Sequence, residues 1–375
     1  MADLSASTWA VVADDLTGAA DAGARFADAG RAVRVHVSAS TDSTLFLHPG
    51  TVQVLVTESR GLDPSAAANA TADAAARLLE SGVDRLYVKI DSVGRGPVAA
   101  QIDGALRAWN TRHSGARVLV CPAYPALGRT VRDGIIHVDG AVATASAAAN
   151  DPVSPVTSSD LRALLERIVS VVVADAVDDD ELQALARAVL DSPSVLPVGS
   201  AGLLGQIVNA LPANAPADGS PAGPAGRIVV ACSSLHPIAL AQVAALESHG
   251  DSGVSIITAP EERMTAETAA DAFGRTVTAA MAAEPAAALV LVGGDGALAA
   301  LRHLGATHVD LDSSLIDGCA TGIVGGGVCD GLRVVTKSGG FGGPRVLVDL
   351  VTLLRRNADS VIDLASESRR KKEES

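Results

Sequence analysis

The sequence contains few aromatic residues and few cysteines. Only 2% of its 375 residues are aromatic, and its four cysteines are scattered, without a CxxC pair or zinc-ligand spacing. This pattern disfavours a structural zinc site, and we expect free thiols in a reducing compartment. Because 48% of the residues are nevertheless hydrophobic, the core must consist of Ala, Val, Leu and Ile, which suits parallel α/β layers.

Long apolar runs and a leader segment are also missing. No stretch reaches the roughly 18 apolar residues that a membrane helix needs, and the first residues have neither a basic region nor an apolar core. The formal net charge is −14, which would repel a polyanion. We therefore expect a cytoplasmic protein that binds neither membrane nor nucleic acid. A small anionic substrate remains compatible, because a few local Arg and Lys side chains can override the global charge.

Familiar nucleotide and hydrolase motifs are absent as well. The sequence has no GxxxxGK[ST] and no HExxH, and no GxGxxG follows a predicted strand. The segment Gly199–Gly202 resembles the GxSxG nucleophile motif only loosely, which supports hydrolase chemistry weakly. A P-loop enzyme and a Rossmann dehydrogenase are both disfavoured.

Short β-branched segments that predict strands, such as Val254–Thr258 and Ala288–Val292, alternate with Ala-rich segments that predict helices, such as Pro64–Ser81, Asp160–Ile168 and Ala266–Ala283. Asp63 is expected to cap the first of these helices, with Pro64 at its first position.

A Pro- and Gly-rich stretch at 212–226 interrupts the alternation. The pattern predicts an α/β protein of two domains, 1–211 and 227–365, joined by that linker. Each domain is expected to hold a mainly parallel sheet flanked by helices, with an interdomain cleft. The charged tail 366–375 is expected to be disordered.

The ADDLTGAAD motif lies where the predicted strand Trp9–Val12 passes into the predicted helix Gly18–Ala29. In open α/β sheets this junction is at the carboxyl edge, where ligands bind. Asp14 and Asp15 point to opposite sides if the strand continues through them, so only one is expected to face a ligand. The alternative is that Asp15 or Thr17 merely caps the helix.

Three other predicted strand ends each carry an arginine beside a hydroxyl residue, in Thr57–Arg60, Lys89–Gly96 and Cys121–Thr130. Arg95 lies between two glycines, and its planar fork suits a carboxylate. Each segment alone could be a surface turn with an exposed ion pair, but three at one sheet edge indicate an anionic, hydroxylated ligand. The candidate substrate-binding residues are Asp14, Asp15, Arg60, Lys89, Asp91, Ser92, Arg95 and Arg129.

Three glycine- or serine-containing turns follow predicted strands of the second domain, at Cys232–Ser234, Gly293–Gly296 and Thr336–Pro344. Such turns expose backbone N–H groups to phosphate oxygens. A plain βα turn is the alternative for each, whereas together they predict a nucleotide phosphate site, with Gly325–Gly327 as a further wall. The candidate nucleotide-binding residues are Ser233, Gly293, Gly294, Asp295, Gly296, Lys337, Ser338, Gly339 and Gly340.

Taken in order, these segments resemble the four-carbon acid sugar kinase family. The matching segments are Ala13–Ala19, Thr57–Arg60, Lys89–Gly96, Pro122–Thr130, Asp151–Asp160, Gly199–Gly202 and Thr336–Gly342. The resemblance implies that ATP, with Mg²⁺, phosphorylates the terminal 4-hydroxyl of threonate, erythronate or 3-oxo-tetronate. It also implies that the N-terminal domain holds the sugar acid and the C-terminal domain holds the nucleotide.

Two departures from the family pattern concern these contacts. Val93-Gly94 stands where Thr-Leu is usual and Pro97 where Asn is usual, and Gly293–Gly296 reads GGDG where Gly-Gly-Glu-Thr is usual. These differences put the substrate contacts and the nucleotide or metal contact in doubt.

As a mechanism, we expect Asp15 to orient or deprotonate the attacking hydroxyl, with Asp14 and Asp91 as rivals. Arg95 and Lys89 would hold the substrate carboxylate. The alternatives are a sugar-acid aldolase or dehydrogenase and a non-catalytic sugar-acid sensor. The metal ligands, the stereoisomer of the substrate and the oligomeric state are not determined by the sequence, and a homodimer is considered.

Overall fold

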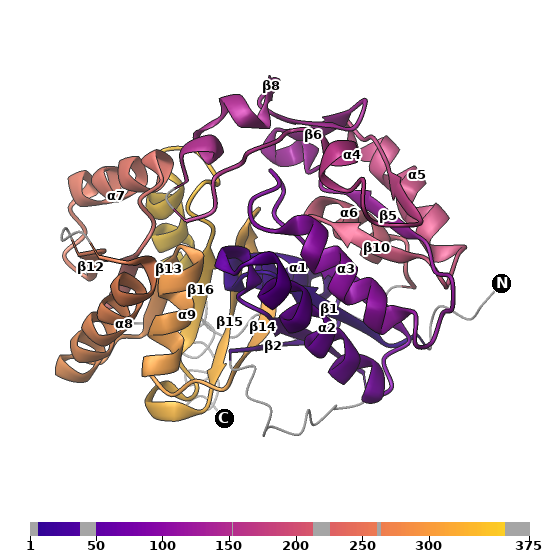
Figure 1. Cartoon of the computed structure of the whole chain (residues 1–375). Helices are drawn as coiled ribbons and strands as arrows, with labels where there is room; N and C mark the ends of the chain where they lie inside the picture. Colours follow the sequence, from indigo (N-terminus) through magenta and orange to yellow (C-terminus); the bar gives the residue numbers. More distant parts are fainter. Residues whose placement is uncertain (1–6, 38–49, 152, 213–225, 261–263, 357–375) are drawn as a thin grey trace, which may run out of the picture. The chain divides into compact units, whose positions relative to one another are not determined.

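The structure, a computed structural model, describes residues 7–37, 50–151, 153–212, 226–260 and 264–356. These residues form a mixed α/β architecture (Figure 1), as predicted from the strand–helix alternation. The chain divides near residue 216 into two compact units, and His308–Leu311 belong to the first unit despite their place in the sequence. The predicted linker and tail fall almost wholly outside the described ranges. In the described part, no helix is long and apolar enough to cross a bilayer.

The first unit is built on a mainly parallel sheet with strand order β14-β2-β3-β1-β4-β10-β5-β9. Only β14 runs antiparallel to its neighbour, pairing His308–Leu311 with Val33–His36 of β2. A second, three-stranded antiparallel sheet joins β6, β7 and β8. The strands are β1 Trp9–Ala13, β2 Ala32–His36, β3 Thr51–Val56, β4 Arg85–Lys89, β5 Val118–Cys121, β6 Arg129–Arg132, β7 Ile135–Val138, β8 Ala141–Val142, β9 Val171–Val173 and β10 Leu196–Gly199. Strand β14 spans His308–Ile316, and only its first four residues belong to this unit.

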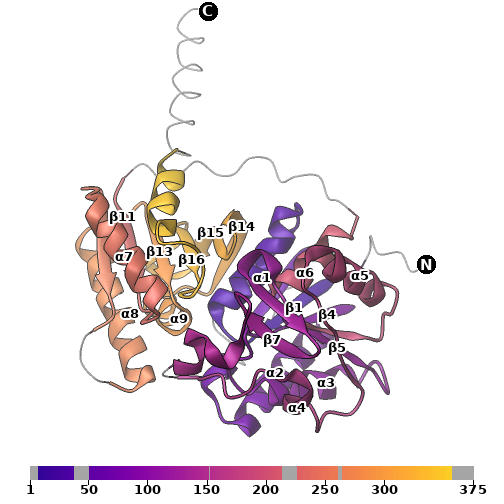
Figure 2. The ribbon, with the colours of Figure 1, turned by 90° about the horizontal axis from the view of Figure 1, so that it is seen from above.

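Two groups of helices cover this sheet (Figure 2). Helices α2 and α3 pack on each other and share an apolar core with β1, β4, β5 and β10, centred on side chains such as Leu78, Ile102 and Trp109. In the other group, α1 packs on α6, and α6 packs on α5. The helices are α1 Leu16–Asp28, α2 Pro64–Glu80, α3 Val98–Trp109, α4 Leu161–Leu164, α5 Asp179–Leu190 and α6 Ala201–Asn209.

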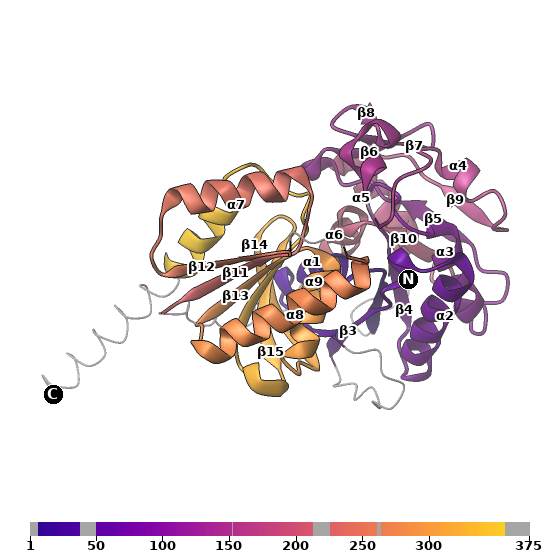
Figure 3. The same cartoon turned by 60° about the vertical axis from the view of Figure 1, so that its left-hand side comes forward.

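The second unit has strand order β12-β11-β13-β16-β15. The first four strands are parallel, and β15 is antiparallel to β16. Figure 3 shows α7 on one face of the sheet and α8 with α9 on the other. A further helix spans residues 346–356. The bounds are β11 Ile228–Cys232, β12 Val254–Thr258, β13 Ala288–Val292, β15 Cys319–Gly325, β16 Arg333–Lys337, α7 Pro237–His249, α8 Ala266–Ala283 and α9 Gly294–His303.

The local sequence explains where several helices begin. Asp63 caps α2 by accepting from the backbone N–H groups of Ser65 and Ala66, and Pro64 occupies the first helical position, as predicted. This arrangement satisfies N–H groups that have no partner inside the helix. The helix predicted over Asp160–Ile168 is wrong in length, because α4 ends at Leu164.

Gly104 lets α3 approach α2 closely, because a Cβ at this position would lie 2.1 Å from the backbone oxygen of Ala68. We expect Gly104→Ala to lower the free energy of unfolding by about 1–3 kcal/mol through overpacking, measured by urea denaturation. Gly205→Ala in α6 is the matched control, since its Cβ would meet the flexible Arg25 side chain at 3.3 Å. Equal stability of the two variants would contradict this account of the helix contact.

Candidate functional site

Asp14 and Asp15 occupy the junction between β1 and α1. Strand β1 ends at Ala13, and Asp15 caps α1: its Oδ1 accepts from the Gly18 N–H at 2.8 Å, and its Oδ2 accepts from the Thr17 hydroxyl at 2.7 Å. Asp15 is therefore the N-cap of α1, as the alternative predicted, and a ligand role for it stays a prediction. Because β1 ends at Ala13, the side-to-side alternation expected for Asp14 and Asp15 does not apply, and both carboxylates bind one guanidinium. The expectation that only one of them faces a ligand stays a prediction.

That guanidinium belongs to Arg60, which follows β3. Its Nε donates to Asp14 Oδ2 at 2.7 Å, and its two terminal nitrogens donate to the Asp15 carboxylate at 3.0 and 2.9 Å. One of those nitrogens also lies 3.6 Å from Asp91 Oδ2. Arg60 thus joins three carboxylates from two different strand ends, and its paired arrangement with Asp15 is the geometry in which charge-assisted hydrogen bonds are strong.

A second arginine extends this cluster. Arg95 donates through Nε and a terminal nitrogen to Asp91 Oδ2, at 3.0 and 2.6 Å, and through its other terminal nitrogen to Asp151 Oδ2 at 2.9 Å. Asp91 Oδ1 accepts from the backbone N–H groups of Val93 and Arg95. The ion pair predicted as an alternative exists, but it is mostly buried, since the Asp91 side chain is only 6% exposed.

Glycines allow these loops to meet. Gly96 has a φ of +81°, and a Cβ there would lie 2.8 Å from the backbone oxygen of Arg60. Beside the start of α1, a Cβ at Gly18 would lie 2.6 Å from Asp15 Oδ1 and 2.8 Å from Lys89 Nζ. The sequence therefore keeps both positions free of a side chain where the acidic and basic groups converge.

The carboxyl groups of the cluster differ in their protonation. Burial raises the pKa of Asp14 above its ordinary value, against the opposing charge of Arg60. Burial also acts to raise the pKa of Asp15, but Arg60 and Lys89 outweigh it, so this pKa is lowered. For Asp91, Arg95 and Arg60 outweigh burial and hold the pKa well below its usual range. Of these three carboxylates, Asp14 is therefore the one that is protonated most readily.

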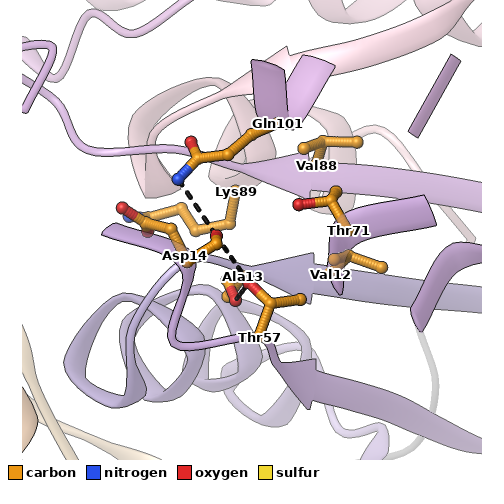
Figure 4. Close-up of a pocket in the computed structure, with 9 residues that line it drawn as sticks. Val12, Ala13, Asp14, Thr57, Thr71, Val88, Lys89 and Gln101 are labelled. Carbon is orange, nitrogen blue, oxygen red and sulfur yellow. Dashed lines mark hydrogen bonds between the residues drawn. The ribbon is translucent and has the colours of Figure 1, made fainter. Parts of the chain in front are cut away.

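Asp14 also lines a narrow space, together with Thr57, Ser59, Lys89 and Gln101 (Figure 4). Gln101 Nε2 donates to Ser59 Oγ at 3.0 Å. Asp14 Oδ1 and Gln101 Oε1 are buried and have no hydrogen-bond partner among the residues that the structure describes. An acceptor left in this state can take a proton or a hydrogen bond from an incoming group.

The remaining predicted residues of the first unit lie nearby. Lys89 is buried, and its Nζ donates to the Ile90 carbonyl at 3.0 Å. Arg129 is half-buried and donates to the Leu127 carbonyl, and its charge interacts with Asp91 and Arg95. Ser92 is buried. Asp151, Ser59 and Gln101 were not predicted as site residues, although Asp151 lies in a segment that carries the family resemblance.

In the second unit, the three predicted turns lie side by side. Cys232 of β11 is in register with Val292 of β13, and Val292 is in register with Lys337 of β16. Because these strands are parallel, their carboxyl ends meet at one edge of the sheet. The Ser233 N–H donates to the Val292 carbonyl at 2.9 Å, and the Gly293 N–H donates to the Lys337 carbonyl at 3.0 Å.

At three glycines of these turns, an added side chain would collide with a serine of the turn after β11. A Cβ at Gly293 or Gly296 would lie 2.6 or 2.4 Å from Ser233 Oγ, and a Cβ at Gly339 would lie 2.0 Å from Ser234 Oγ. Gly293, with a φ of +108°, immediately precedes α9. Gly294, Asp295 and Gly296 form the first turn of that helix, whose N-terminal N–H groups favour an anion.

Lys337 and Gly325–Gly327 lie differently from the other candidate residues of this unit. Lys337 is fully buried, and its Nζ donates to the Ser338 carbonyl at 2.8 Å, so the ammonium lies against the backbone of its own loop. Burial lowers the pKa of Lys337 to about 8. Gly325–Gly327 do not form a wall of the same site, because the antiparallel register of β15 with β16 places them beyond Arg333, at the opposite sheet edge.

Comparison with known proteins gives matches over both units. Residues 9–170 match the family described as a sugar-binding N-terminal domain, and residues 239–347 match the family described as a nucleotide-binding C-terminal domain.

Among curated proteins, D-threonate kinase of Bordetella bronchiseptica is 34% identical, over 92% of this chain and 97% of that protein. A 3-oxo-tetronate kinase of Methylobacterium radiotolerans is 26% identical, over 88% of this chain and 96% of that protein.

Solved structures are also similar. A protein of Bordetella bronchiseptica described as a domain of unknown function, crystallised with citrate as a domain-swapped dimer, is 33% identical with a TM-score of 0.50, over 93% of this chain and 98% of that chain. A Salmonella typhimurium structure described as a putative tRNA synthase has a TM-score of 0.70 at 19% identity, over 91% of this chain and 98% of that chain. At that identity the second likeness shows the fold alone.

Removing Arg60 should leave Asp14 and Asp15 without their strongest counter-charge. We expect Arg60→Gln to lower the free energy of unfolding by about 3–5 kcal/mol at pH 8, because buried carboxylates lose their counter-charge. Their folded-state pKa values then rise above the unfolded value, so the deficit grows with pH and shrinks toward pH 5. Urea denaturation between pH 5 and 8 measures it.

The matched control is Arg107→Gln, which removes an exposed pair with Asp103 at 3.4 Å. An exposed pair contributes at most about 1 kcal/mol, so this variant should stay close to the unmodified protein. A deficit of Arg60→Gln that is the same at every pH would contradict the assignment of Arg60 to the carboxylates.

Proposed function

We propose a specific reaction for this chain, which belongs to the four-carbon acid sugar kinase family: ATP donates its γ-phosphoryl group to the terminal 4-hydroxyl of a four-carbon sugar acid. The curated relatives are kinases, so the chain is a phosphotransferase. The observation that carries the proposal is the pair of sites, an acid–arginine cluster in the first unit and three adjacent turns in the second. The first unit would hold the sugar acid and the second the nucleotide.

D-Threonate is the first substrate to test. A 34% identical relative that this chain matches over 97% of that protein's length is named a D-threonate kinase. Relatives named 3-oxo-tetronate kinase are less similar, at 26–28% identity. The citrate in a 33% identical structure is a carboxylate ligand of that protein, which fits an organic acid site. Erythronate and 3-oxo-tetronate are to be tested beside it.

Lys89 and Arg95 would hold the substrate carboxylate, with Arg60 and Arg129 as second candidates. Lys89 Nζ has three donors and donates to one carbonyl, so it has capacity for a ligand. Arg95 has a planar fork but already binds two carboxylates. Arg60 is engaged by three acids, which fits an ordering role better than a substrate contact.

For the proton acceptor we propose Asp14 in preference to Asp15. Both oxygens of Asp15 accept two hydrogen bonds each, from Thr17, Gly18 and Arg60. Asp14 Oδ1 has no partner in the described part of the chain, and burial raises the Asp14 pKa. A carboxylate with a vacant oxygen and a raised pKa is the better base toward a hydroxyl. Asp15 would then keep Arg60 and the start of α1 in place.

The second unit would bind ATP through backbone N–H groups. Ser233, the turn Gly293–Gly296 and the loop Ser338–Gly340 would surround the phosphates. Among the described residues no group of three or more His, Cys, Asp or Glu side chains is placed to hold a metal. This fits Mg²⁺ that arrives bound to the nucleotide, because Mg²⁺ then takes only one or two carboxylates. Asp295 is the carboxylate within these turns.

Phosphoryl transfer also requires that the two ligands be brought together. The γ-phosphate and the hydroxyl must come together in line while water is excluded, so we propose that the two units close on their ligands during the reaction.

A homodimer is part of the proposal, on the ground that a 33% identical relative crystallised as a domain-swapped dimer.

A coupled assay of ADP release tests the reaction. With ATP and Mg²⁺, we expect turnover above background for D-threonate, L-threonate, D-erythronate or 3-oxo-tetronate, and none for glycerate or five-carbon acids. Omission of Mg²⁺ should abolish it, and the position of the phosphate in the product is read by ³¹P NMR. Binding of a four-carbon acid without ADP release would favour a sensor, and would overturn the proposal.

The choice of base is tested by Asp14→Asn, which preserves volume and an acceptor for Arg60. We expect kcat to fall about 100-fold or more with an unchanged thermal melting curve. In the unmodified enzyme, kcat should fall as the pH decreases through the Asp14 pKa, because a base must be ionised. Asp15→Asn is the comparison variant, expected to lose stability as well. If Asp14→Asn turns over normally while Asp15→Asn does not, the base is Asp15.

A further inference from the structure

We infer that two buried side chains, Gln242 and Lys337, are positioning residues that hold the loop Ser338–Gly343 in the conformation that receives the nucleotide phosphates. The inference rests on the proposed function, and it concerns groups that do not touch the ligand themselves.

Gln242 lies in α7 and is completely buried. Its Nε2 donates to three successive carbonyl oxygens of the loop, those of Phe341, Gly342 and Gly343, at 3.0, 3.2 and 2.9 Å. Three acceptors require the NH₂ end of the amide at this place. Gln242 Oε1 has no hydrogen-bond partner in the described ranges, which is a destabilising state for a buried oxygen. An apolar side chain would avoid that cost, so a role for the donor is indicated.

Lys337 acts on the start of the same loop. Its fully buried ammonium donates to the Ser338 carbonyl at 2.8 Å. In register beside it lie Val292 and Cys319, so the side chain belongs to the buried interior of the unit. The two buried donors thus bind the carbonyl oxygens of four loop residues.

Because the peptide group is planar, the directions of these carbonyl groups also fix the directions of the loop's N–H groups. In a planar trans peptide, each C=O is antiparallel to the N–H of the next residue, and the described residues contain no cis peptide bond. Carbonyls directed at the buried donors therefore direct the N–H groups of Gly339, Gly342 and Gly343 away from them. Gly342 and Gly343 are exposed, so their N–H groups are available to an anion.

The position of the loop agrees with this role. It follows β16, whose carboxyl end adjoins the Gly293 turn, and Gly339 lies against Ser234 of the turn after β11. Gln242 and Lys337 therefore act on a loop that shares its sheet edge with the other predicted phosphate-binding turns.

The test uses Gln242→Met, which keeps the length of the side chain and removes the donor. We expect the Kd of Mg·ADP, measured by isothermal titration calorimetry, to rise about 5- to 20-fold, as for loss of about one to two hydrogen bonds. KM for ATP should rise in parallel, with KM for the sugar acid changed less than about two-fold. Gln242→Glu, which directs an oxygen at the carbonyls, should be worse than Met. Lys337→Met should weaken Mg·ADP binding in the same direction.

Val243→Ala in the same helix is the control. Val243 is buried in the apolar core of this unit and its side chain has no hydrogen-bond donor, so its truncation should lower the melting temperature and leave the Kd unchanged. Amide exchange of residues 338–346 supplies a second measurement, expected to be faster in Gln242→Met and not in Val243→Ala.

The outcomes separate the two proposals. An unchanged Kd in a folded Gln242→Met, or an equal weakening in Val243→Ala, overturns the positioning role and leaves the proposed function intact. If the unmodified protein binds Mg·ADP but phosphorylates no four-carbon acid, the proposed function fails while the positioning role can still be supported. If it binds no nucleotide, both fail.

Discussion

The acidic end of β1 depends above all on one cation, Arg60. Asp14 and Asp15 are adjacent in sequence and buried, and two neighbouring carboxylates cannot remain ionised in the interior without a counter-charge. Arg60 supplies it, at 2.7 Å from one and 2.9 Å from the other, and its distance of 3.6 Å from Asp91 links a second strand end to the same charge. The ends of three neighbouring strands are thereby held together by electrostatics as well as by the sheet, which is the preorganisation that a substrate site requires.

In the second unit, strand register and backbone hydrogen bonds hold the strand ends together, where the first unit uses charged side chains. There the register of β11, β13 and β16 aligns three strand ends, and glycines let the turns approach one another closely. Buried side chains then fix the direction of the peptide groups, as Gln242 does for three carbonyls. Charge is concentrated in one unit and peptide dipoles in the other, which suits a charged organic acid and a polyphosphate respectively.

Periodicity predicted most of the fold. Three elements match their predicted bounds, namely Val254–Thr258, Ala266–Ala283 and Ala288–Val292. Each has a hydrophobic pattern typical of either a strand or a helix along its whole length and is bounded by residues that break the pattern. Strand β10 escaped prediction, since Pro197 lies within it and proline argues against a central strand. The candidate site residues at strand ends could be predicted, because charged residues and glycines that directly follow a predicted strand stand out in the sequence. Gln101 and Gln242 could not, because a buried glutamine within a helix has no local signal and its partners are distant in sequence.

The short return of His308–Leu311 to the first unit has a practical consequence. These residues, encoded about a hundred positions after that unit's other strands, pair with β2, where Arg34 binds Asp310 through two hydrogen bonds at 2.7 and 2.8 Å. A fragment that stops at residue 212 would lack them and would leave the backbone groups along β2 without their neighbour. Unprotected strands of this kind invite aggregation. The N-terminal half taken alone would therefore expose β2 as an edge strand that the whole chain covers.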